Sequence, residues 1–284
     1  MSHGLISLAA LLDGATFSAA KSPLVPLASI LELIAVGGWP STQGISANSA
    51  LRNHQSYLQD LVEYDFQTLD GPSDSSIAKQ VLRSLARNVG QKTPISTIAK
   101  DVPGANNAPL RHPTAQAYVS KFQQLMVIEE VPAWVPHLRS RHTVLTSPIR
   151  HFVDPSLALA ALSGTPAKLL KDLKTAGFLF ENMLIRDLLV YSDAIGAKVT
   201  HYRDETGLEV DAVVEAFDGS WGAIEIKMGF HAVDEAAENL LKFKARVDTS
   251  VVGEPTFLAV LTNSEYSYTR PDGVHVISIT ALGA

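Results

Sequence analysis

The sequence predicts an α plus α/β architecture: a helical N-terminal segment, a winged-helix domain and a C-terminal α/β domain. Three observations support this prediction. Residues 1–72 carry apolar side chains at helical spacing, residues 73–162 place three helices before two strands, and residues 163–284 alternate strands with amphipathic helices. The run Asp70–Ser73 contains Gly and Pro, which end regular structure and mark the first boundary.

The composition is that of an ordinary globular protein. Of the 284 residues, 46% are hydrophobic and 18% are charged, the net charge is −6, and cysteine is absent. The acidic balance does not indicate a nucleic-acid binder, so any such contact needs a local basic patch. The lack of cysteine excludes disulfides, thiolate metal sites and cysteine nucleophiles, and it fits a cytoplasmic location. We find no signal peptide and no run of membrane-spanning length.

Residues 1–72 are expected to be mostly helical. Apolar runs over Leu5–Leu12 and Leu27–Val36 each end close to a glycine, which is a typical helix stop. A third helix is expected over Leu51–Leu69, where the apolar side chains have roughly helical spacing.

Residues 73–162 have the order of a winged-helix domain, in which three helices precede a strand, a loop and a second strand. Helices are expected from Ser75 or Ser76 to Gly90, over Pro94–Ala99 and over Thr114–Met126, and strands over Val127–Val131 and Thr143–Leu145. The third helix would read DNA, but its exposed face is only weakly basic. Two interpretations therefore stay open: a domain that only packs, or a DNA-binding domain with candidate contacts Lys121, Arg139, Arg141 and Arg150.

Residues 163–284 are expected to form the α/β domain. One helix is expected within Pro166–Tyr191 and an amphipathic one over Ala232–Arg246, with strands over Val199–Tyr202, Glu209–Val214, Ile224–Met228, Thr256–Thr262 and Val274–Ile279. The strand over Thr256–Thr262 shows little alternation, as in a sheet covered on both faces.

The second and third of these strands are joined by a tight turn whose last residue is Gly219. A three-residue loop ending at this glycine pairs Asp211 with Glu225 and needs a left-handed conformation that glycine adopts readily. With this register, Asp211, Glu225 and Lys227 converge on one face of the sheet.

Two carboxylates side by side cost free energy unless a cation neutralises them. Mg²⁺ or Mn²⁺ held by Asp211 and Glu225, with Lys227 beside it, would supply such a cation, because hard oxygen ligands suit these ions. The alternative is a solvated sheet face with one cross-strand salt bridge. The spacing of the residues alone does not decide between the two.

Short motifs along nearly the whole chain resemble those of a known family. Phe178-Leu-Phe-Glu181-Asn182, Glu209-Val-Asp211 and Glu225-Ile-Lys227 look like the motifs of the PD-(D/E)XK nuclease-like fold. More particularly, they resemble the uncharacterised module that follows the ATPase domain in many prokaryotic AAA-type proteins. Upstream, the family's order is matched by Gly37-Gly38-Trp39-Pro40, Tyr57-Leu-Gln-Asp60, Ser147-Pro148 and Phe152-Val-Asp154.

The resemblance implies a helical lid remnant, a winged helix and a nuclease-like α/β domain. It also implies that Glu181 is the helix carboxylate, that Asp211 and Glu225 bind Mg²⁺ or Mn²⁺, and that Lys227 positions or activates the attacking water. Glu181 could equally be an ordinary carboxylate on a helix surface. The phosphate-binding Gly-x-x-x-x-Gly-Lys-Ser/Thr loop is absent, so this chain is not expected to hydrolyse ATP by itself.

Two functions follow as expectations. The first is metal-dependent phosphodiester hydrolysis on DNA by the C-terminal part of an AAA-type ATPase-like protein. The second is a catalytically silent nuclease-like module that docks onto an ATPase domain or a partner protein. The acidic net charge favours the second, and metal binding would separate the two.

Overall fold

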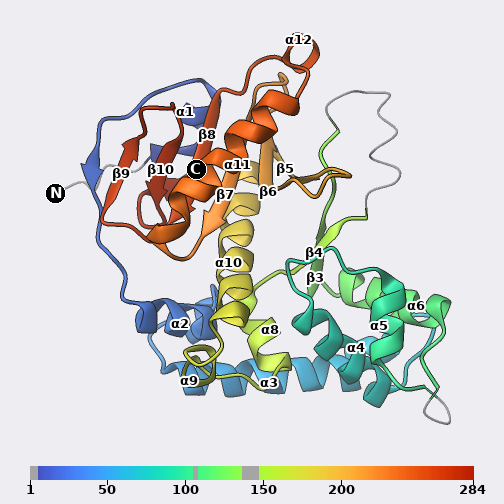
Figure 1. The fold of residues 1–284 in the computed structure, drawn as a ribbon. Coiled ribbons are helices and arrows are strands. Elements are labelled where there is room, and N and C mark those ends of the chain that lie inside the picture. Colours follow the sequence, from blue (N-terminus) through green and yellow to red (C-terminus); the bar gives the residue numbers. More distant parts are fainter. Residues whose placement is uncertain (1–5, 105–107, 136–146) are drawn as a thin grey trace. The chain divides into compact units, whose positions relative to one another are not determined.

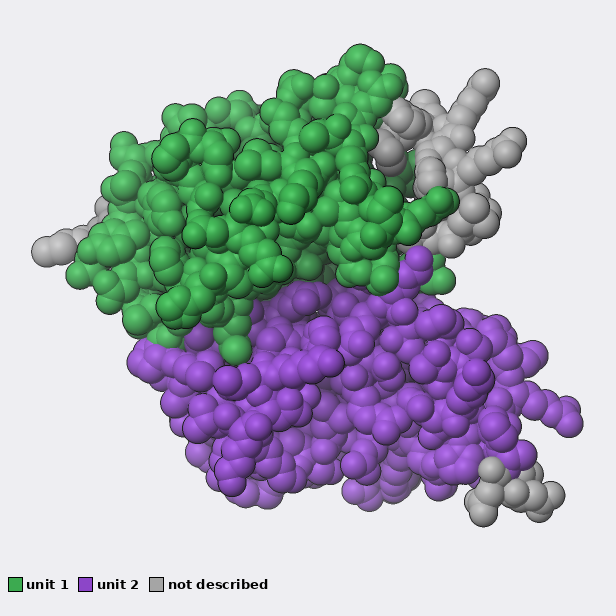
Figure 2. Space-filling view, in the orientation of Figure 1, with its two compact units in different colours: residues 1–25, 131–148, 184–284 green, residues 26–130, 149–183 purple. Residues whose placement is uncertain are grey.

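The structure is a computed structural model that describes residues 6–104, 108–135 and 147–284. Its chain forms two compact units, each assembled from separate stretches of sequence (Figure 2). Unit 1 comprises residues 1–25, 131–148 and 184–284, and unit 2 comprises residues 26–130 and 149–183. These units differ from the predicted segments 1–72, 73–162 and 163–284. Compact units defined by contacts do not test that division, which stays a prediction.

Unit 1 is built on a seven-stranded mixed sheet with the order β2-β9-β10-β8-β7-β6-β5 (Figure 1). The strands are β2 (Ala20–Lys21), β5 (Lys198–Arg203), β6 (Glu209–Glu215), β7 (Trp221–Lys227), β8 (Phe257–Thr262), β9 (Tyr266–Thr269) and β10 (His275–Ser278). Strands β7, β8 and β10 are parallel, and the outer strands on both sides pair antiparallel with their neighbours. A separate parallel pair joins β1 (Ile6–Ser7) to β11 (Leu282–Gly283).

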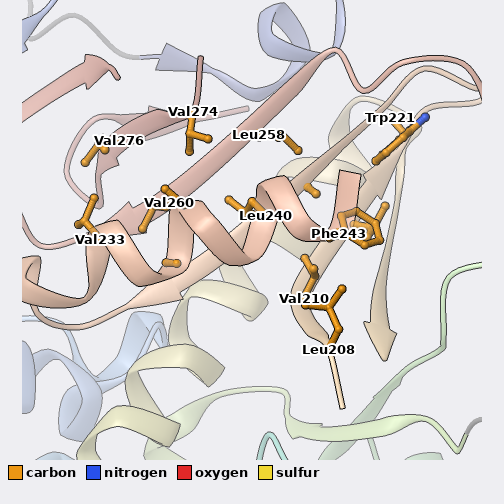
Figure 3. Close-up of a cluster of buried hydrophobic side chains, with 14 of the residues drawn as sticks. Leu208, Val210, Trp221, Val233, Leu240, Phe243, Leu258, Val260, Val274 and Val276 are labelled. Carbon is orange, nitrogen blue, oxygen red and sulfur yellow. The ribbon is translucent and has the colours of Figure 1, made fainter. Parts of the chain in front are cut away.

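Helix α11 (Val233–Arg246) packs on β6, β7 and β8. Its buried residues are spaced by three or four positions and form one apolar stripe: Val233, Ala236, Ala237, Leu240 and Phe243. Acidic residues in its first turn and basic residues in its last turn suit the helix dipole. The stripe meets apolar side chains of the sheet, among them Trp221, Leu258 and Val260 (Figure 3). This packing is the hydrophobic core of unit 1.

The other helices of unit 1 are short. They are α1 (Leu8–Leu12), α12 (Thr249–Val252) and the 3-10 turn η4 (Phe230–Ala232). Unit 1 also contains the second half of the long helix α10 (Leu173–Ala194). No helix in the described ranges is both long enough and apolar enough to cross a lipid bilayer.

Unit 2 is mainly helical. It contains α2 (Leu27–Val36), η1 (Pro40–Thr42), α3 (Ala47–Glu63), η2 (Asp65–Thr68), α4 (Ser75–Arg87), α5 (Ile95–Asp101), α6 (His112–Gln124), α8 (Pro155–Ala161), α9 (Pro166–Leu169) and the first half of α10. Strands β3 (Ile128–Val131) and β4 (Ile149–Phe152) pair with each other. The prediction of a mixed α/β chain is therefore confirmed.

Three helices and a strand occur in the predicted order between residues 75 and 131. Helix α4 begins one residue after Asp74, whose carboxylate caps it, and not at a Ser75 or Ser76 cap as expected. The strand expected over Thr143–Leu145 lies outside the described residues, and β3 pairs with β4. The winged-helix and nuclease-like assignments stay predictions.

The described residues before Pro26 belong to unit 1. Strand β2 lies against β9, and Ser22 donates its backbone N–H to the carbonyl oxygen of Glu265. Asn263 then bonds to both the N–H and the carbonyl oxygen of Val25 through its side-chain amide. Strands β1 and β2 were not predicted, because two residues are too few to show an alternation pattern.

Candidate functional site: a carboxylate–lysine cluster

Strands β6 and β7 form a hairpin with the register expected from the sequence. Their pairs run from Glu215–Trp221 to Ala212–Ile224, and the loop between them holds three residues and ends at Gly219. The φ angle of Gly219 is +90°, in the left-handed region that favours glycine. The paired residues end at Ala212 and Ile224, one position before Asp211 and Glu225.

Strand β6 contains a bulge at this position. Asp211 and Ala212 together face a single residue of β5, because the register between the two strands shifts by one. A bulge re-aims the side chains next to it. Oδ2 of Asp211 accepts a hydrogen bond of 2.7 Å from the backbone N–H of Ile226. The N–H of Ile226 on β7 is therefore paired with the side chain of Asp211 and not with a backbone carbonyl oxygen of β6.

Asp211, Glu225 and Lys227 come together at the end of the hairpin. Nζ of Lys227 lies 2.5 Å from Oε2 of Glu225 and 3.4 Å from Oδ2 of Asp211. The side-chain amide of Asn239 on α11 donates to Oε1 of Glu225 (2.6 Å) and to the carbonyl oxygen of Glu209 (2.6 Å). Asn239 is not among the predicted site residues, because a single Asn beside the core residue Leu240 gives no signal in the sequence.

The cluster is largely buried. The side chains of Glu225, Asp211 and Lys227 are 3%, 18% and 32% exposed. Helix α11 covers this face of β7, where Trp221 and Ala223 belong to the hydrophobic core. The cross-strand salt bridge of the alternative interpretation is present, but the face is not solvated at Glu225.

Burial dominates the electrostatics of Glu225. It raises the pKa of the Glu225 carboxyl to about 8, with a further upward contribution from the charge of Asp211. Lys227 and Asn239 act in the opposite direction by stabilising the ionised form. Two carboxylates share one ammonium, so the fully ionised cluster carries an uncompensated negative charge. Such a cluster favours a proton or a further cation.

The donor atoms of the cluster fit a hard divalent cation. Asp211 and Glu225 present carboxylate oxygens from neighbouring strands to the Nζ atom of Lys227, and oxygen ligands of this kind are those that Mg²⁺ and Mn²⁺ prefer. Within the described ranges, no group of three or more His, Cys, Asp or Glu side chains could hold a metal ion. A cation bound here would therefore complete its shell with water or substrate oxygens, as Mg²⁺ commonly does.

Glu181 belongs to the other unit, on the first half of α10. Its Oε1 lies 3.1 Å from the position that a Cβ at Gly90 would occupy, and Cε1 of His151 lies 3.7 Å from the same position. The neighbouring Asn182 is fully buried and bonds to both the N–H and the carbonyl oxygen of Phe152 on β4. Asn182 thus joins α10 to β4, while the helix-carboxylate role of Glu181 stays a prediction.

The described nucleic-acid candidates point into unit 2. Nζ of the buried Lys121 donates to the carbonyl oxygen of Phe66 (3.1 Å) and lies 4.6 Å from the centre of that ring. Desolvation lowers the pKa of Lys121. Nε of Arg150 forms an ion pair of 2.9 Å with Glu130, and only 11% of the Arg150 side chain is exposed. Arg139 and Arg141 lie outside the described residues.

Several basic side chains of unit 1 are neutralised by carboxylates. Ion pairs join Arg203 to Glu209, Lys244 to Glu254, Arg246 to Asp204, and Arg270 to both Asp234 and Asp272. These pairs reduce the positive potential that unit 1 can offer to a nucleic acid.

The fold and the cluster define an α/β protein of two units, with a buried carboxylate–lysine site on its larger sheet. Residues 27–168 match a family described as Domain of unknown function (DUF8612), and residues 176–282 match Domain of unknown function (DUF4143). The first match spans half of the chain, which therefore belongs to the DUF8612 family. The DUF4143 match covers the C-terminal part of the chain alone, and it links that part to a domain found in AAA-ATPase-associated proteins.

Among solved structures, the chain is similar to one described as a refined half-complex from a tetradecameric assembly of Thermococcus gammatolerans McrB AAA+ hexamers with bound McrC. The identity is 12%, the similarity covers 75% of this chain and 73% of that chain, and the TM-score is 0.27. A likeness at this level supports no conclusion about fold or function. None of the curated proteins matches the chain.

Proposed function

We propose that Asp211, Glu225 and Lys227 form the divalent-cation site of a PD-(D/E)XK nuclease-like domain in an AAA-associated protein. The activity that fits this site is Mg²⁺- or Mn²⁺-dependent hydrolysis of phosphodiesters in DNA. One observation carries the proposal: the carboxylates of Asp211 and Glu225, on neighbouring strands, meet at the ammonium of Lys227, so the cluster attracts positive charge. The winged-helix assignment of residues 73–162 belongs to the same proposal.

The surrounding residues hold the two carboxylates in place. Asn239 orients Glu225 through Oε1, and the N–H of Ile226 orients Asp211 through Oδ2. A divalent ion bound there would stabilise the negative charge that develops on a phosphodiester. Lys227 would place a positive charge next to the attacking water.

Thermal melting with and without Mn²⁺ tests the metal site. We expect Mn²⁺ to raise the melting temperature of the wild-type chain and not that of Asp211→Asn, because a ligand that binds the native state stabilises it. Glu238→Gln is the matched control, since it removes an exposed carboxylate from α11 and should keep the Mn²⁺ effect. No Mn²⁺ effect in the wild type would contradict the metal site.

Cleavage of supercoiled plasmid DNA in Mg²⁺ or Mn²⁺ tests the activity. The wild type and Glu238→Gln should nick the plasmid, and Asp211→Asn should not. Failure to cleave any DNA or RNA offered, together with a clear Mn²⁺ effect on melting, would retain the metal site and reject the catalytic part of the proposal.

The second candidate function is a catalytically silent module that docks onto an ATPase domain or a partner protein. The short contact between Lys227 and Glu225 favours it, because a lysine can serve as the permanent counter-ion of the carboxylates. The paired basic side chains of unit 1 also favour it. For this candidate, melting should not respond to Mn²⁺.

A further inference from the structure

A groove of about 390 Å³ opens in unit 2 between α3, α4 and α8, three helices that pack against one another. This volume lies within the range of roughly 300–1,000 Å³ that is usual for ligand sites. The floor is apolar, with Leu58, Leu82 and Ala160 buried beneath it. The rim is polar and is formed by Gln55, Gln59, Lys79, Gln80, Arg83 and Ser163.

Small side chains at the end of α8 leave this space open. Ala160 and Ala161 line the groove where a larger residue would fill it. Ala160 is buried, whereas Ala161 is only half-buried, so Ala161 is a position where added bulk reaches into the groove without entering the core.

The groove is positively charged in a chain whose net charge is −6. Its lining carries the cations Lys79 and Arg83 and includes no carboxylate. Lys79 forms an ion pair with Glu63 just outside the lining. Arg83 has no ion-pair partner among the residues that the structure describes, and it is exposed. The local charge therefore selects an anionic occupant.

The remaining lining chemistry distinguishes between anionic occupants. Glutamine amides both donate and accept hydrogen bonds, which matches a peptide backbone, and the apolar floor matches aliphatic side chains. Single-stranded nucleic acids are usually held by aromatic side chains that stack on the bases, and the lining includes none. We propose that this groove binds an acidic peptide segment of a partner protein, with an aliphatic side chain on the floor and a carboxylate at Arg83.

A peptide-display selection on the full chain, followed by fluorescence anisotropy with the selected peptides carrying fluorescein, tests this proposal. The selected peptides should be acidic and contain aliphatic residues. Arg83→Glu should weaken binding by about tenfold or more, because it replaces the cation that faces the peptide carboxylate with an anion. Ala161→Phe should have an effect of similar size, because its ring occupies space in the groove. Lys171→Glu reverses an exposed charge elsewhere in unit 2 and should leave binding within about twofold.

Melting temperatures of the variants show whether each is folded, and the exposed Arg83 can be changed without disturbing the core. The proposal is overturned if no peptide is selected, if the selected peptides lack net negative charge, or if Arg83→Glu binds them equally well. It is also overturned if labelled DNA of about 12 nucleotides, and not peptide, binds in an Arg83-dependent manner. Asp211→Asn should bind the peptides normally, so this test is independent of the metal site.

Discussion

At the residue scale, the protonation of Glu225 links the cluster to stability. Its pKa is raised from 4.5 to about 8, mainly by burial, so the native state holds a proton between these pH values that the unfolded chain has lost. Because the native state binds more protons in this window, the free energy of unfolding falls as pH rises through it.

We therefore expect the stability of unit 1 to fall between pH 5 and 8 in the wild type, by up to about 1.4 kcal/mol per pH unit. Glu225→Gln removes the titrating group and should flatten this slope. Urea unfolding at several pH values, followed by the fluorescence of the buried Trp134 and Trp221, measures both. Parallel pH profiles for the two proteins would show that Glu225 titrates normally.

Lys227 should matter for stability whether or not the protein cleaves DNA. Lys227→Met leaves the two carboxylates without their ammonium, and we expect a loss of about 1–3 kcal/mol, since the partial exposure of the lysine lowers the cost. If a divalent cation binds, Mn²⁺ should recover part of the loss. Equal melting temperatures of variant and wild type, without metal, would contradict a structural role for this ion pair.

At the element scale, two of the short sequence motifs meet at the start of α8. Asp154 caps this helix, and its Oδ2 accepts the N–H of Gly38 (2.8 Å) from the segment after α2. Nε1 of Trp39 donates to Oγ of Ser156 (3.2 Å). A Cβ at Gly37 would lie 2.5 Å from both Asp154 and Ser156, and the φ angle of Gly37 is +72°, so this position requires glycine.

Asp154→Ala should destabilise unit 2 by about 2–4 kcal/mol. It removes a helix cap, worth about 0.5–2 kcal/mol, and leaves the N–H of Gly38 without this acceptor, at about 1–3 kcal/mol. Thermal unfolding followed by Trp39 fluorescence measures the loss. Asp172→Ala is the control, because Asp172 accepts the N–H of Thr175 at the exposed start of α10 and its removal should cost less. Equal losses for the two variants would contradict a special role for the contact between Asp154 and Gly38.

Most helices and strands and the register of the hairpin could be predicted from the sequence, whereas the burial of the site could not. Alternation along β6 and β7 and the glycine at position 219 were enough to predict the register of the hairpin and the convergence of Asp211, Glu225 and Lys227. The same alternation left a solvated face open as an alternative, whereas α11 buries Glu225 there. The packing of α11 over Glu225 and the contact of Asn239 with Glu225 depend on tertiary structure, and no local sequence pattern indicates them. The bulge at Asp211 depends on pairing with β5 and is equally invisible in the local sequence.

At the scale of the whole molecule, both units are assembled from distant stretches of sequence. Unit 1 takes residues 6–25 from the start of the described chain and pairs them with β9 and β11 near its end. The predicted α/β domain over 163–284 did not include them, because β1 and β2 have two residues each and leave no periodic signal.

The N-terminal stretch should protect the edge of the large sheet. Strand β2 is the outermost strand, and without it β9 becomes an exposed edge that can pair with other chains. We expect a chain lacking residues 1–25 to melt at a lower temperature and to aggregate more readily on heating. Amide hydrogen exchange should become faster in β9 and stay unchanged in α3, which lies in unit 2 and serves as the internal control. Unchanged exchange in β9 together with an unchanged melting temperature would mean that β2 does not stabilise the sheet. Faster exchange confined to β9 would mean that residues 6–25 are a structural part of the unit that carries Asp211 and Glu225.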